Sequence, residues 1–293
     1  MKCVSIRECP IRISLSTNCV QFIYCIFSSF VVSTENGGAV LFNSAGSLKF
    51  YHSTFYNISA GGSCHGGAIY STGLWTNSSF CCYQGCKALI GGAATVIGNN
   101  CFDNNVVSTC YSTEQDSLRI SSGYHHQKNL NSTFNSAVGD GSGLELSITK
   151  GTDVKFINLA YNTGSGVFSI WVVNSGNSDV HKINLVHSKC SKGVIFLSNS
   201  WTVNSMAYFN NTGPFFFTGS IPSIKIIECS FDIATVSYSF MLATSCQFNT
   251  SPILVTFESD SLFQCEGISY PYSISDSGLK LITPILIFSL IIQ

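Results

Sequence analysis

The sequence predicts an all-β protein that folds as a right-handed parallel β-helix of about ten to twelve turns. Three observations lead to this prediction: recurring glycine-alanine turns, short apolar strands between them, and few charged residues. Charged residues make up 10% of the 293 residues, whereas hydrophobic residues make up 45%. Glu, Lys and Arg solubilise long helices, so this composition favours short strands joined by tight turns.

The glycine-alanine turns are three Gly-Gly-Ala motifs that begin at residues 37, 66 and 91. Each motif is followed by an apolar strand-like run, as expected when strands stack turn upon turn. Glycine suits the corners of such a coil because it accepts a positive φ and lets backbones approach closely. The predicted corner residues are Gly37, Gly38, Ala39, Gly66, Gly67, Ala68, Gly91, Gly92 and Ala93.

The second half of the chain keeps the strand rhythm and loses the motif. Runs at 154–157, 181–185, 201–203 and 224–227 begin successive units about 20 to 27 residues apart. We therefore predict one β-helix over residues 1–275. Residues 110–151 fit least well, and we interpret them as a lateral loop or a junction, with a second domain as the alternative.

Both ends of the chain bear on localisation. Residues 1–17 contain Arg7, Glu8 and Arg12 and lack the uninterrupted apolar core of a secretory signal. We expect that the true start differs from the given one, with unconventional export as the alternative. Residues 276–293 are apolar, and Leu281–Ile292 carries no charge. This tail is shorter than a bilayer span. The alternatives are a truncated membrane anchor, the tail of a lipid-anchor signal, and a final capping strand.

The cysteines and glycosylation motifs favour an exported protein. The chain has 14 cysteines, more than is usual in a reduced cytosolic protein. Five N-x-[ST] motifs predict weak candidate glycosylation sites at Asn57, Asn77, Asn131, Asn210 and Asn249. We therefore expect a cell-surface or extracellular location, with membrane anchoring through Leu281–Ile292 as one option.

Nucleic-acid binding and cofactor chemistry are not predicted. The formal net charge is −1, and no basic stripe exists that could neutralise phosphates. The Gly-Gly-Ala motifs lack the Lys-Ser/Thr ending of a phosphate-binding loop. We predict no cofactor, no metal site and no nucleic-acid partner.

The repeat pattern also carries a family resemblance. Gly37–Val40 and Gly66–Ile69 match GGA[ILV] well, and short Phe-Asn or Cys-Ser-Phe strands such as Phe102–Asn105 and Cys229–Phe231 alternate with them approximately. This pattern resembles the polymorphic outer-membrane proteins of chlamydiae and related surface proteins of protists such as trichomonads. The motif covers only about residues 20 to 110. The resemblance implies a pectin-lyase-like β-helical ectodomain, a surface location and a role in adhesion, and it supplies no catalytic residues.

Acidic residues are the candidate catalytic groups, because a β-helix could also carry a polysaccharide lyase or hydrolase. Glu114/Asp116 and Glu258/Asp260 are spaced to share strand faces, and a solvated edge is the simpler interpretation. Asp140, in the turn VGDGSG, is the best single candidate, with a turn-stabilising role as the simpler interpretation. Five further acidic residues are isolated in sequence: Asp103, Glu145, Asp153, Asp179 and Asp232.

Three further clusters have structural interpretations. Cys81, Cys82 and Cys86 have tolerable zinc-ligand spacing but no nearby histidine, so inward-pointing cysteines or disulfides are favoured. His125 and His126 would point to opposite faces of a strand, and we interpret them as part of a solvated loop. The Phe215–Phe217 run is interpreted as core, with an exposed binding patch as the alternative.

These observations lead to three hypotheses about function. The first is a non-enzymatic surface protein that binds host-cell or extracellular proteins or glycans, with no catalytic residues. The second is a carbohydrate-active enzyme. The third is a partial member of a large family that has no independent function.

Overall fold

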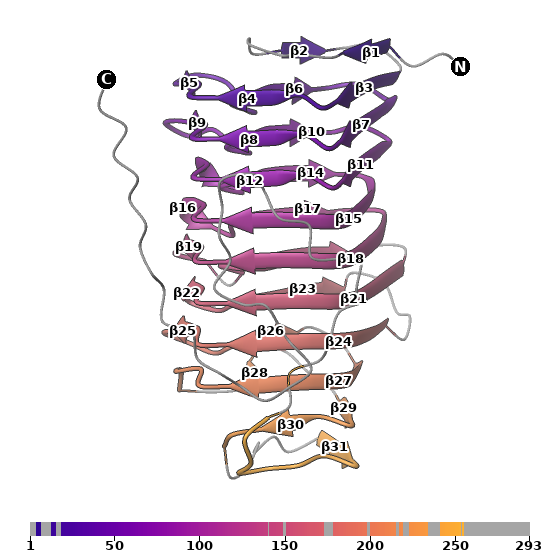
Figure 1. Ribbon diagram of the computed structural model, residues 1–293, viewed down its shortest axis with the longest axis vertical. Coiled ribbons are helices and arrows are strands. Elements are labelled where there is room, and N and C mark those ends of the chain that lie inside the picture. The colour runs from indigo at the N-terminus through magenta and orange to yellow at the C-terminus, as the bar shows by residue number, and fades with distance from the viewer. Residues whose placement is uncertain are drawn as a thin grey trace, which may run out of the picture.

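The computed structural model is a parallel β-solenoid of about eight turns, and the regular elements of its described part are all strands (Figure 1). It describes residues 4–6, 13–15, 19–139, 141–148, 151–172, 178–197, 200–214, 217–218, 223–233, 241–252 and 254. Successive turns stack along one axis, and every strand pair has parallel register. The predicted all-β parallel β-helix is therefore confirmed, and its described part forms about eight turns.

Three parallel sheets form the sides of the coil. The first sheet has 15 strands and the longest path. Its main strands are β1 (Val4–Ile6), β3 (Cys19–Ile23), β7 (Ser47–Tyr51), β11 (Trp75–Ser79), β15 (Asn99–Ser108), β18 (Tyr124–Thr133), β21 (Gly151–Ala160), β24 (Ser178–Val186), β27 (Trp201–Phe209), β29 (Ile224–Ile227) and β31 (Met241–Thr244). Its short side strands are β4 (Ile26–Ser28), β8 (Thr54–Tyr56), β12 (Cys82–Gln84) and β30 (Ser230–Phe231).

The other two sheets complete each turn. The second sheet consists of β2 (Ile13–Leu15), β6 (Val40–Phe42), β10 (Ile69–Ser71), β14 (Ala94–Ile97), β17 (Leu118–Ser121), β20 (Leu144–Ile148), β23 (Phe168–Val172), β26 (Ile195–Leu197) and β28 (Phe217–Thr218). The third consists of β5 (Val31–Val32), β9 (Ser59–Ala60), β13 (Lys87–Ile90), β16 (Tyr111–Gln115), β19 (Ser136–Ala137), β22 (Thr163–Gly164) and β25 (Lys189–Cys190). We number the turns as coils 1 to 8, starting at residues 19, 47, 75, 99, 124, 151, 178 and 201.

The segment 110–151 continues the coil. It contributes β16 to β20, each in register with the coils before and after it. His125 and His126 lie in β18, so the predicted solvated loop at this pair is wrong. His125 is buried inside the coil, whereas His126 lies on the outer face, because adjacent strand residues point to opposite sides. The apolar tail 276–293 lies outside the described residues.

Two bends with positive φ recur in every coil. The first bend is at Tyr24 in coil 1 and the second at Ser29, five residues later. The same five-residue separation holds through coil 8, where the bends are Ser205 and Asn210. The length of the repeat therefore varies outside this segment.

The Gly-Gly-Ala motifs occupy the corner that leads into the second sheet. Their first glycine has a positive φ, +68° at Gly66. Their second glycine leaves no room for a side chain: a Cβ on Gly67 would lie 1.9 Å from the carbonyl oxygen of Gly92. The alanine that follows, such as Ala68, is fully buried. These glycines are therefore required by the backbone geometry of the corner.

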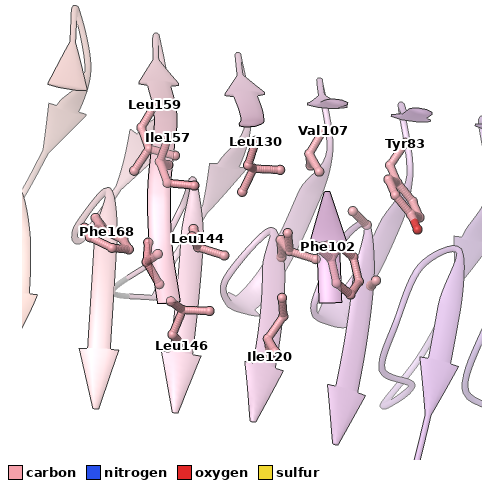
Figure 2. Close-up of a cluster of buried hydrophobic side chains, with 14 of the residues drawn as sticks. Tyr83, Phe102, Val107, Ile120, Leu130, Leu144, Leu146, Ile157, Leu159 and Phe168 are labelled. Atoms are coloured by element: carbon pink, nitrogen blue, oxygen red, sulfur yellow. The ribbon is translucent and has the colours of Figure 1, made fainter. Parts of the chain in front are cut away.

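The core is one continuous column of inward-pointing side chains (Figure 2). Rings stack between coils, as in the pair Phe27 and Phe55, whose centroids are 4.9 Å apart. Near the second bend, side-chain amides replace apolar residues. Asn135 Oδ1 accepts from the backbone N–H of Cys110 at 2.8 Å, and Asn162 Oδ1 accepts from the N–H of Asn135 at 2.9 Å. Such bonds satisfy backbone donors that a bend would otherwise leave unpaired inside the fold.

Candidate functional site

The Gly-Gly-Ala corner is replaced in coil 4 by Gln115, Asp116 and Ser117. Leu118 lies opposite Ala94 in the sheet, so Asp116 occupies the place that Gly92 has in coil 3. Asp116 has a positive φ of +39°, the backbone conformation that the first glycine, Gly91, has in coil 3, and it has no exposed surface. A carboxyl group is thus inserted into a corner where the preceding coils have only backbone.

Asp116 contacts Glu145 of the next coil. Its Oδ1 accepts from the N–H of Gly141 at 2.8 Å, and its Oδ2 is buried with no hydrogen-bond partner among the described residues. Burial, followed by the hydrogen bond and charge of Glu145, raises the pKa of Asp116 well above its usual range. Two neighbouring carboxylates repel each other, so protonation of one of them is favoured. The raised pKa points to Asp116 as the group that holds its proton more tightly.

Arg119 fixes the other side of Glu145. The two residues lie directly opposite each other in β17 and β20, and Arg119 Nε is 3.4 Å from Glu145 Oε1. Arg119 Nη1 also donates a hydrogen bond to Oε1 of Gln115. Glu145 is consequently held between a buried acid and a guanidinium group.

A polar hollow of about 470 Å³ lies over this cluster. Its lining residues come from coils 4, 5 and 7: Glu114, Gln115, Arg119, Val138, Gly139, Glu145, Ser147 and Lys192. A β-bulge shapes its rim, because three residue steps along β16 (Ser112 to Gln115) lie opposite two steps along β13 (Ala88 to Ile90). Bulges redirect side chains, and here the bulge leaves Glu114 exposed beside buried Asp116.

The geometry of the carboxyl pair bears on the predicted glycosidase chemistry. Glycoside hydrolysis uses carboxyl groups about 5 to 9.5 Å apart on either side of the scissile bond. Asp116 and Glu145 contact each other, and Asp116 is fully buried. This pair therefore does not have the arrangement of a glycosidase acid and base.

Replacing Asp116 by Asn is expected to remove a pH dependence of stability. The pKa of Asp116 is higher in the folded chain than in the unfolded chain, where it is about 4. Asp116 therefore contributes its full stabilisation at pH values below about 4, and this contribution is lost as the pH rises towards the pKa of the folded chain. The wild-type free energy of unfolding should fall by about 1.4 kcal/mol per pH unit across that window. Asn keeps the acceptor for Gly141 and cannot ionise. Urea unfolding at pH 5, 7 and 9 measures the difference.

Asp153→Asn is the matched control, since Asp153 lies on the outer face beside His126 and Lys155. Wild type and this control should show the same loss between pH 5 and 9, and Asp116→Asn should show less. Parallel curves for all three proteins would contradict a raised pKa of Asp116 in the folded chain.

A second candidate region is the outer face of the first sheet in coils 1 to 3. We call it the aromatic face, and it consists of Tyr24, Ile26, Tyr51, His52, Tyr56, Trp75 and Phe80. Tyr24, His52 and Phe80 occupy the first bend in successive coils, and their rings stack at 5.1 and 4.9 Å between centroids. Tyr24 is 64% exposed and Ile26 is 65% exposed. Of the nine outward positions on β3, β7 and β11, only Lys49 is charged.

The outer face changes character in coils 4 to 6. Cys101, His126 and Asp153 lie opposite one another on β15, β18 and β21, with His126 Nδ1 2.9 Å from Asp153 Oδ2. Burial, followed by the charges of Asp103 and Asp153, raises the pKa of the Cys101 thiol. A nucleophilic cysteine needs a lowered pKa, so the structure does not support a nucleophilic role for this column.

All three cysteines of the predicted cluster are buried. Cys81 and Cys86 are buried inside the coil, and burial raises the pKa of Cys81 to about 11. Cys82 is disulfide-bonded. Within the ranges that the structure describes, no three His, Cys, Asp or Glu side chains are placed to hold a metal ion.

The glycosylation motifs differ in exposure. Asn57, Asn210 and Asn249 are exposed at positions with positive φ. Asn77 and Asn131 are half-buried on β11 and β18. Several predicted residues lie outside the described part of the chain: Asp140, Phe215, Phe216, Glu258, Asp260 and Leu281–Ile292.

Sequence reasoning missed the pairing of Asp116, Arg119 and Glu145. The solvated-edge interpretation of Asp116 is wrong, because the corner buries its side chain completely. Arg119 and Glu145 are 26 residues apart, which is one repeat of the coil. Opposite charges separated by one repeat are the signal that could have found this contact.

The fold and its surfaces define a parallel β-solenoid with an aromatic outer face and a separate polar hollow. Comparisons with protein-family models, with curated proteins and with solved structures found no match to this chain. The described strands and connections include no helix with the length and apolar character needed to cross a bilayer.

Proposed function

We propose that this chain is a non-enzymatic protein of the cell surface or extracellular space, and that its aromatic face binds a protein partner. The observation that carries this proposal is the combination of exposed Tyr, Trp and Ile side chains with an almost uncharged outer face. Protein interfaces are enriched in aromatic residues and depleted of charge at their centres. A contiguous exposed apolar patch is a common mark of such a site.

The resemblance to polymorphic outer-membrane proteins and related protist surface proteins supports the same function. It implies adhesion to host cells, and stacked repeats offer a long flank for contact with a partner. Glycans are the alternative partner class for this face. The carboxyl pair at Asp116 and Glu145 gives no geometric support to the carbohydrate-active enzyme.

The triple variant Tyr24→Asn, Ile26→Thr, Tyr51→Thr is expected to lose binding by at least about tenfold. Exposed aromatic anchors often contribute 2 kcal/mol or more at interface centres, and more than one is removed here. Asn tolerates the positive φ at residue 24. Binding is measured with the full chain on cells and on arrays of extracellular proteins and glycans.

The control is the double variant Lys128→Thr, Lys155→Thr. These two lysines lie opposite each other on β18 and β21 of the same sheet, in coils 5 and 6. It should bind as wild type does. The proposal fails if the wild-type chain binds no cell or extracellular protein, or if both variants lose binding equally. Binding to glycans alone, through the same residues, would replace the protein partner by a glycan.

A further inference from the structure

We infer that the hollow over Glu145 is a binding site for one unit of a neutral glycan, separate from the aromatic face. The site begins where coil 4 departs from its neighbours. The bulge in β16 and the exchange of Gly-Gly-Ala for Gln115-Asp116-Ser117 occur in consecutive residues, and both shape the same hollow. Its volume of about 470 Å³ lies in the usual range for small-molecule sites.

The buried acid gives Glu145 a fixed position. Asp116 has no exposed surface, its Oδ2 is buried without a hydrogen-bond partner, and Glu145 is the neighbouring carboxyl group that contributes to its raised pKa. Arg119 holds Glu145 from the neighbouring strand at 3.4 Å. Both supporting residues belong to the coil itself, so the acceptor is preorganised before a ligand arrives. Asp116 is a positioning residue here, because it is sealed from the hollow.

The charges around the hollow favour a neutral ligand. Glu114 and Glu145 carry one negative charge each, and Arg119 and Lys192 carry one positive charge each. Burial and the neighbouring Glu145 raise the pKa of Asp116, which favours its neutral form. These four charges sum to zero. A charged ligand would therefore be repelled by the groups of its own sign, and no excess of opposite charge would compensate for that repulsion.

The donors and acceptors suit sugar hydroxyls. Each hydroxyl both donates and accepts. Glu114 and Glu145 supply acceptors, whereas Gln115, Arg119 and Lys192 supply donors within the same lining. Val138 is exposed at the rim and offers an apolar contact for the C–H face of a sugar ring. A purely apolar ligand would leave most of these groups unpaired, and burial of unpaired polar groups is unfavourable.

Calorimetric titration of the full chain tests this site. The probes are neutral trisaccharides built from glucose, galactose, mannose or N-acetylglucosamine, with trigalacturonate as the charged comparison. At least one neutral trisaccharide is expected to bind in a 1:1 ratio. Glu145→Gln and Glu114→Gln should each weaken that binding by about tenfold, the usual effect of losing a hydrogen bond to a charged group. Trigalacturonate should bind more weakly than the neutral probe.

Two controls separate this result from other causes. Glu114 is exposed, so Glu114→Gln tests the site even if Glu145→Gln disturbs folding. The aromatic-face triple variant should bind the trisaccharide as wild type does, which distinguishes this site from the proposed function. The inference is overturned if no neutral probe binds, if neither glutamate variant weakens binding, or if trigalacturonate binds more tightly.

Discussion

Replacing Gly67 by alanine is expected to lower the free energy of unfolding by about 4 kcal/mol or more. The added Cβ would lie 1.9 Å from the carbonyl oxygen of Gly92 and 2.8 Å from the backbone nitrogen and oxygen of Lys87. None of these atoms belongs to a flexible side chain. Gly67 also donates to the carbonyl of Gly91 at 2.9 Å, and its own carbonyl accepts from Gly38 at 3.0 Å. Relief of the clash therefore requires the separation of three hydrogen-bonded coils.

Gly61→Ala is the matched control for this prediction. Gly61 lies in the same coil, and the nearest atom to an added Cβ is the carbonyl oxygen of Val32 at 3.6 Å, an ordinary contact. This substitution should be neutral or stabilise by up to about 1 kcal/mol, because alanine has less freedom in the unfolded chain. Chemical denaturation of the two variants measures the difference. Equal stability for both would show that the corner can expand, contrary to the geometry.

The Gly-Gly-Ala corners are the part of the fold that the sequence predicts best. Their spacing reports the length of one coil, and their residue types report a bend with a close backbone approach. Alternation of buried and exposed side chains on strands such as β7 supplies the rest of the pattern. Both signals are local, so they can be read without knowledge of the neighbouring coils.

The two bends with positive φ were only partly predictable. Asn57 and Asn104 fit the expectation that Asn occupies bends. Phe134 and Tyr161 do not, since bulky residues rarely adopt a positive φ, whereas His187 is of a type that does so more often. Their rings stack between coils at 4.8 and 5.0 Å. Such stacking contributes about 0.5–1.5 kcal/mol per pair of rings. It partly offsets the backbone strain of a positive φ, which costs about 1–3 kcal/mol per residue. This compensation exists only after the coils have stacked.

The candidate site depends even more on stacking. Along the chain Asp116 pairs only with Glu114 and Glu145 looks isolated, and the contact between Asp116 and Glu145 arises from the register between coils 4 and 5. Burial of Asp116 follows from the loss of the glycine corner, which the faded repeat after residue 110 indicated only indirectly. The sequence thus predicted where the repeat changes, whereas the chemistry of that place required the three-dimensional register.

The buried ring of His125 is the source of the second large effect, which is acid lability. His125 is fully buried, and its Nε2 donates to the carbonyl of Ser147 at 3.1 Å. Its Nδ1 therefore accepts from the amide Nδ2 of Asn100. Burial lowers the pKa of His125 from 6.5 to about 4, although the bond to Ser147 partly opposes this shift. A proton on Nδ1 would have no acceptor in this arrangement.

His125 should therefore lower the free energy of unfolding by about 3 kcal/mol as pH falls from 7 to 4. The unfolded chain takes up a proton near pH 6.5, whereas the folded chain does so only near pH 4. Stability present above pH 6.5 is thus lost through this window. The side chain of the His125→Asn variant cannot ionise, so its free energy of unfolding should fall by about 3 kcal/mol less than that of wild type between pH 7 and 4. A packing defect caused by the substitution would lower stability equally at every pH and would not change this difference.

Chemical denaturation at pH 4, 5, 6 and 7 measures this difference, with His126→Asn on the outer face as the control. Burial also lowers the pKa of His52, His65 and His187, but these rings are far more exposed than His125 and remain in every protein compared. Protonation of Asp116 acts in the opposite direction and is likewise common to all three proteins. The slope should therefore change only in His125→Asn. An identical loss in His125→Asn and wild type would show that the buried ring takes up its proton without cost, and would contradict the network of Asn100, His125 and Ser147.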